Sequence, residues 1–115
     1  MRDLEEVREK VAEFASDRDW GKFHSPKNLA MALSVEVAEL LEIFQWLTES
    51  ESSNLSSEQL MAVSHEVADV QVYLVRLADK LGIDILHAVE EKMCLNAQKY
   101  PALKVRGSAK KYTEY

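Results

Sequence analysis

The segments SVEVAELLEIFQW (residues 34–46) and SHEVADVQVYL (residues 64–74) decide how this chain is interpreted. Each combines frequent apolar residues with a pair of acids at a spacing of three. Residues three apart lie on the same face of a helix, with Cβ atoms roughly 5–6 Å apart. If the two helices face each other, four carboxylates surround one point. These four are Glu36, Glu39, Glu66 and Asp69.

The neighbours of these acids distinguish them from ordinary surface acids. Glu36 has Leu33 three residues before it and Leu40 four residues after it, and Glu66 has valines in the same relation. Both acids therefore belong to the apolar stripe of their helix. Glu42 follows Glu39 by three residues and is interpreted as peripheral to the cluster of acids. Buried like charges need a partner, and a hard divalent cation prefers oxygen ligands. The pattern predicts a metal site.

Three other interpretations of these acids compete with a magnesium site. Surface salt-bridge acids do not fit the apolar neighbours of Glu36 and Glu66. A metal-free cluster that shares protons is possible, at a cost of several kcal/mol per unpaired ion. A di-iron carboxylate protein uses Glu-x-x-His pairs, but His65 stands beside Glu66 and His87 has no glutamate three residues before it. An oxygen-only set favours Mg²⁺, with Mn²⁺ possible.

Composition limits the class of protein. The chain has 115 residues, 47% apolar and 30% charged, with 3 Gly and 2 Pro, which is typical of a single helical domain over residues 1–115. No apolar run approaches 18 residues and the N-terminus has no signal-peptide pattern, so we expect no membrane association. Cys94 is the only cysteine, which fits a reducing cytoplasm.

The charge is unevenly distributed. The net charge is −6, yet six basic side chains and one acid follow residue 91. An acidic chain disfavours nucleic acid as a partner, whereas a basic tail beside a metal-binding body suits a small polyanion. A merely solvated tail is the alternative. Because a core of this size is modest, oligomerisation is expected to supplement it.

Helix signals predict an all-α bundle of four helices with an irregular basic tail. The predicted helices cover residues 2–19, 26–47, 57–81 and 84–99. Ser25 with Pro26 starts the second, and Ser56 with Gln59 fits a capping box for the third. Gly82 is a good stop for the third helix. The polar stretch ESESSNLSS is predicted to be a loop.

Aromatic residues near the acids are candidates for a nucleobase pocket. Trp46 follows Glu39 by seven residues and Tyr73 follows Asp69 by four, so each lies one or two turns from a predicted ligand. Such faces can stack on a base, although aromatic side chains are individually more often core. For His24, the simpler interpretation of the sequence is a loop or cap histidine.

The chain resembles the MazG-like all-α nucleoside triphosphate pyrophosphohydrolases, in particular the dCTP pyrophosphatase branch. The resemblance rests on Glu-x-x-Glu followed by Glu-x-x-Asp and on FASDRDWGKFHSPKNLAMAL, EVAELLEIFQW, EVADVQVYLVRLA, KMCLNAQKYP and RGSAKKYT. It implies a Mg²⁺-dependent hydrolase that cleaves dCTP or a related, modified deoxynucleotide to the monophosphate and pyrophosphate, and so serves nucleotide-pool sanitation. It also implies a homodimer or homotetramer.

The resemblance also assigns roles to residues. The four acids become magnesium ligands and catalytic residues. The substrate-binding candidates are Trp20, His24, Trp46, Tyr73, Lys92, Asn96, Lys99, Tyr100, Arg106, Lys110 and Tyr112. Val11 stands where animal members have a pocket histidine, nine residues before Trp20, so the base preference stays open. The rival interpretation is a non-catalytic, nucleotide-binding helical oligomer or regulator.

Overall fold

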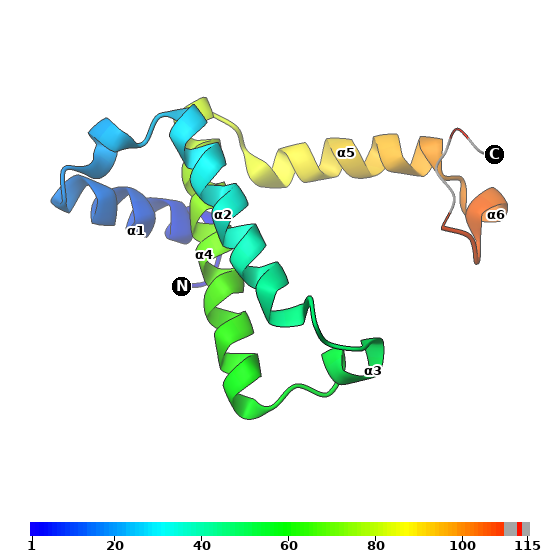
Figure 1. Cartoon of the computed structure of the whole chain (residues 1–115). Coiled ribbons are helices and arrows are strands. Elements are labelled where there is room, and N and C mark those ends of the chain that lie inside the picture. The colour runs from blue at the N-terminus through cyan, green and yellow to red at the C-terminus, as the bar shows by residue number, and fades with distance from the viewer. Residues whose placement is uncertain (110–112, 114–115) are drawn as a thin grey trace. The chain divides into compact units, whose positions relative to one another are not determined.

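The computed structural model describes residues 1–109 and 113, and every regular element in that part of the chain is helical. Figure 1 shows the elements in chain order. They are α1 (Leu4–Asp17), the 3₁₀ helix η1 (Trp20–Phe23), α2 (Pro26–Phe44), α3 (Glu49–Ser52), α4 (Ser57–Leu81), α5 (Ile85–Lys99) and α6 (Ala102–Val105). Among the described residues, no helix combines the length and the apolar content that crossing a membrane requires.

The predicted all-α architecture is confirmed, because α1, α2, α4 and α5 coincide with the four predicted helices to within three residues at each end. The starts follow the predicted caps. The Ser25 hydroxyl accepts from the Asn28 backbone N–H, and Ser56 with Gln59 forms a capping box at α4.

The three one-turn helices η1, α3 and α6 were not predicted, and α6 lies in the tail that was predicted to be irregular. The loop prediction for ESESSNLSS missed α3, which is held by a second capping box: the Thr48 hydroxyl accepts from the Glu51 N–H and the Glu51 carboxylate accepts from the Thr48 N–H. Four residues are too few for a hydrophobic periodicity, so only such local bonds reveal a helix of this length.

The chain forms two compact units, residues 1–82 and 83–115. In the first unit α2 runs antiparallel to α4 along much of its length, and α1 packs on α4 (Figure 1). Their contact buries Ala15, Leu29, Val75 and Ala78, each at most 6% exposed. The two alanines permit a close helix approach. The second unit holds α5 and α6. That residues 1–115 act as one domain stays a prediction.

The end of α4 depends on a glycine. Gly82 has φ 66° and ψ 29°, the left-handed conformation, and its N–H donates to the carbonyls of Ala78 and Asp79. A side chain raises the energy of this conformation. A Cβ on Gly82 would meet no atom within 4 Å, so the conformation alone sets the cost of a substitution.

Gly82→Ala is therefore expected to lower the free energy of unfolding by about 1 kcal/mol. Urea denaturation followed by circular dichroism measures the change. Gly21→Ala is the matched control, because Gly21 lies in η1 without left-handed backbone and also has open space at its Cβ. An equal loss in both variants would contradict the conformational explanation.

Candidate metal centre and adjoining pocket

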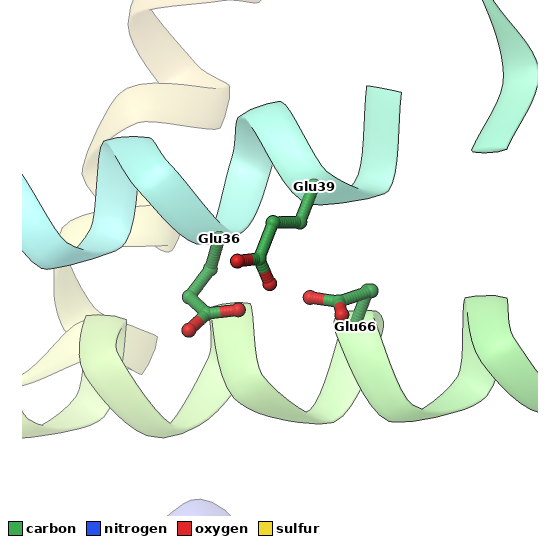
Figure 2. A group of neighbouring side chains, drawn as sticks. All are labelled: Glu36, Glu39 and Glu66. Carbon is green, nitrogen blue, oxygen red and sulfur yellow. The ribbon is translucent and has the colours of Figure 1, made fainter. Parts of the chain in front are cut away.

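Three carboxylates from two helices meet in the first unit. Glu36 and Glu39 project from α2 and Glu66 from the facing side of α4, and Figure 2 shows all three carboxyl groups pointing toward one another. One oxygen from each lies within 4.8 Å of the others. The spacing of three on α2 and the antiparallel contact with α4 together produce this convergence, which includes three of the four predicted carboxylates.

The carboxylates at this point lack partners. Glu36 Oε2 and Glu66 Oε2 are buried and have no hydrogen-bond partner. Burial raises the pKa of Glu36 to about 7, and the neighbouring carboxyl groups of Glu66, Glu39 and Asp69 add to the rise. Unpaired buried carboxylates cost free energy. A divalent cation that accepts both orphaned oxygens as ligands removes this cost, so the donor set fits a hard metal ion.

Asp69, the fourth predicted ligand, lies one turn after Glu66 on α4 and is exposed. It is not among the three converging carboxylates, although its charge contributes to the raised pKa of Glu36. Its side chain borders a neighbouring pocket instead. Its role as a metal ligand stays a prediction.

This pocket has a volume of about 410 Å³ and lies between α1, η1 and α4. Its walls are largely aromatic and aliphatic. The ring of Trp20 lies edge-on to that of Phe14 at 5.7 Å and to that of His24 at 6.4 Å, measured between centroids. The full lining is Met1, Lys10, Val11, Phe14, Ala15, Trp20, His24, Asp69, Val72, Tyr73 and Arg76.

The structure thus brings together three of the predicted substrate-binding residues, Trp20, His24 and Tyr73, from separate segments. Trp46 does not line this pocket and is 86% exposed just beyond the end of α2. Five further candidates lie in the second unit, whose position relative to the pocket is not described: Lys92, Asn96, Lys99, Tyr100 and Arg106. Lys110 and Tyr112 lie outside the described residues. All of these roles stay predictions.

Sequence analysis missed Arg76. Arg76 lies seven residues after Asp69 and three after Tyr73, so the three side chains share one face of α4. The arginine is 8% exposed and borders the pocket. Its helical phase with Asp69 could have identified it as a residue near the site. A single cation within an apolar stripe does not by itself indicate such a role.

An all-helical body with converging carboxylates beside an aromatic pocket defines the class of protein. Residues 31–115 match the MazG-like family, and the chain belongs to that family. It is 46% identical to human dCTP pyrophosphatase 1 and 45% identical to the mouse protein of the same name, over 96% of this chain in each case. A crystal structure of a pyrophosphatase from Archaeoglobus fulgidus superposes with a TM-score of 0.81 at 44% identity, covering 85% of this chain and 92% of that one.

The chain spans 66% of the length of the human and mouse relatives.

The carboxylate cluster makes a stability prediction. A carboxyl whose pKa is raised in the folded state binds its proton more tightly there than in the unfolded chain. The folded form therefore loses stability as the pH rises from about 4.5, the ordinary pKa of a glutamate, to about 7, the raised pKa of Glu36. With a chelator at pH 8, Glu36→Gln should raise the free energy of unfolding by about 1 kcal/mol, because the neutral amide removes the repulsion.

Glu42→Gln is the control for this measurement. Glu42 is exposed on the same helix and lies outside the cluster, so its replacement should change stability by less than about 0.5 kcal/mol. Denaturant titrations at pH 6 and pH 8 give the comparison. A Glu36→Gln variant that is less stable than wild type at pH 8 would contradict the electrostatic account.

Proposed function

We propose that this chain is a Mg²⁺-dependent nucleoside triphosphate pyrophosphohydrolase. Its substrate is dCTP or a related deoxynucleotide, modified cytosine nucleotides included, and its products are the monophosphate and pyrophosphate. Such a reaction removes unwanted nucleotides from the precursor pool. The observation that carries the proposal is the pair of orphaned buried oxygens on Glu36 and Glu66, in a chain 46% identical to a dCTP pyrophosphatase.

Glu36, Glu39 and Glu66 would hold the metal, with Asp69 as a fourth ligand from the adjacent turn. Once bound, Mg²⁺ supplies charge neutralisation at the phosphates and a lowered pKa for an attacking water. Mn²⁺ has the same ligand preference and is expected to substitute. A carboxylate oxygen of the cluster that is left uncoordinated would accept the proton of the attacking water.

The aromatic pocket would hold the base. Trp20 from η1 and Tyr73 from α4 both line a pocket large enough for a pyrimidine nucleoside. Asp69 lines this pocket and lies on α4, one turn after Glu66. This continuity supports a nucleotide whose base lies in the pocket and whose phosphates reach the carboxylates.

The basic residues of the second unit would neutralise the triphosphate. Lys92 and Lys99 are seven residues apart and therefore lie on one face of α5. Arg106 directly follows α6. Charge-assisted contacts to the β- and γ-phosphates are the strongest that such side chains make. Sequence charge alone supports this assignment.

We also propose that the protein acts as a homodimer or homotetramer. Large apolar side chains on α2 and α4 of the first unit are more than half exposed, an amount that suggests cover by another copy. They are Met31, Val35, Leu41, Leu60, Met61 and Val67. Light scattering should give a mass of at least two chains, and a strict monomer would contradict the proposal.

The activity is tested with a panel of triphosphates and Mg²⁺. Purified protein should release pyrophosphate from dCTP, and Glu66→Gln should lower kcat by at least about 100-fold because a charged ligand is lost. Circular dichroism checks that the variant is folded. Wild-type protein that binds dCTP but leaves it intact would favour a nucleotide-binding regulator instead.

Trp20→Ala tests the base pocket. Base–aromatic stacking is worth about 1–3 kcal/mol, so KM for dCTP should rise about 5- to 150-fold. An unchanged KM would remove Trp20 from the base site. Trp46→Ala tests the sequence prediction separately, since Trp46 does not reach the pocket within its own unit. An equal rise in KM would place Trp46 at the substrate through another part of the assembly.

A further inference from the structure

Arg76 and His24 share a hydrogen bond that fixes the chemistry of the histidine. The Arg76 Nε–H donates to His24 Nδ1 at 3.2 Å. Arginine is always protonated and has no acceptor, so Nδ1 must offer a lone pair. The imidazole is therefore neutral and carries its proton on Nε2.

Arg76 is held where it is by an ion-pair chain. It is only 8% exposed, and its Nη1 lies 3.5 Å from Asp79 Oδ2. The other oxygen of Asp79 lies 3.4 Å from Arg8 Nη1 on α1. A buried guanidinium without such a partner would be strongly disfavoured. The ion pair that Arg76 itself makes with Asp79 therefore sets the direction in which its Nε–H points.

His24 in turn borders the aromatic pocket, with its ring edge-on to Trp20. Its Nδ1 is occupied by Arg76, and among the described residues no protein acceptor is seen for Nε2. The Nε2–H is the donor that remains for a ligand. Pyrimidine bases carry a carbonyl acceptor at O2, which a fixed N–H donor can recognise.

We propose that Arg76 is a positioning residue that holds His24 as a neutral Nε2–H donor to an acceptor on the bound base. The inference rests on the proposed function for the identity of that base. A site built to hydrogen-bond a substrate group discriminates well against analogues that lack it, because its own polar atom is then left unpaired. Arg76 thereby contributes to base selection through His24.

The surroundings of His24 support the neutral form. Burial lowers the pKa of His24, and the positive charges of Arg76 and Lys80 lower it further. Lys10 from α1 and Asp69 from α4 also border the pocket, and Asp79 pairs with Arg76.

The tautomer is measured directly on the whole protein without nucleotide. Nitrogen-15 spectra of the histidine side chains at pH 7 should show His24 with an unprotonated Nδ1 and a protonated Nε2. Arg76→Met should produce a mixture of tautomers. Arg8→Met is the matched control: it breaks the ion pair to Asp79 on the α1 side and leaves the bond to His24, so the wild-type pattern should persist. A wild-type His24 protonated on Nδ1 would overturn the proposal even if Arg76→Met failed to fold.

A double-mutant cycle tests whether Arg76 acts through His24. With dCMP as the probe, calorimetry should give about 2- to 10-fold weaker binding for His24→Phe, which keeps the ring and loses the donor. Arg76→Met should lose a similar factor, and the double variant should be no weaker than His24→Phe alone. Losses that multiply would show that Arg76 acts independently of His24 and would overturn the proposal. Because the tautomer is read without nucleotide, its failure is distinct from a failure to hydrolyse dCTP.

Discussion

The mutual repulsion of three glutamates across the contact between α2 and α4 is the constraint on which the structure depends. Packing of the apolar stripes brings the helices together, and the same stripes contain Glu36 and Glu66. Two buried oxygens, Glu36 Oε2 and Glu66 Oε2, are therefore left without hydrogen-bond partners. A sequence optimised for stability alone would place apolar side chains there. Retaining the carboxylates is understandable as an adaptation to a cation.

The stabilising contacts lie further along the same helix pair. Leu29 near the start of α2, Val75 and Ala78 near the end of α4, and Ala15 of α1 form the buried core. The ion pairs that Asp79 makes with Arg8 and Arg76 close the same region. The repulsion among the carboxylates is thus separated along the helices from the apolar packing that stabilises the helix pair. The wall of the pocket includes Asp69, one turn after Glu66, as well as Ala15 of the core and Arg76.

Sequence patterns predicted the long helices and a cluster of Glu36, Glu39, Glu66 and Asp69, because periodicity and spacing fix which residues share a helix face. The three glutamates converge, and Asp69 is not among them. These patterns could not place Trp46, since its side chain follows the last turn of α2 and helical phase no longer applies there. They could not predict the hydrogen bond between His24 and Arg76, because the two residues are 52 positions apart in the chain. The pocket itself is a product of tertiary packing, which no local pattern records.

The most direct test of the account is to locate a bound divalent cation. Mn²⁺ titrated into isotope-labelled protein broadens the NMR signals of nuclei close to it. The account predicts selective broadening around residues 36–39 and 66–69, reversed by excess Mg²⁺, while the acidic turn of α3 (Glu49–Ser52) keeps sharp signals. Broadening centred on α3, or none at the three glutamates, would contradict the claim that the facing helices form a metal site.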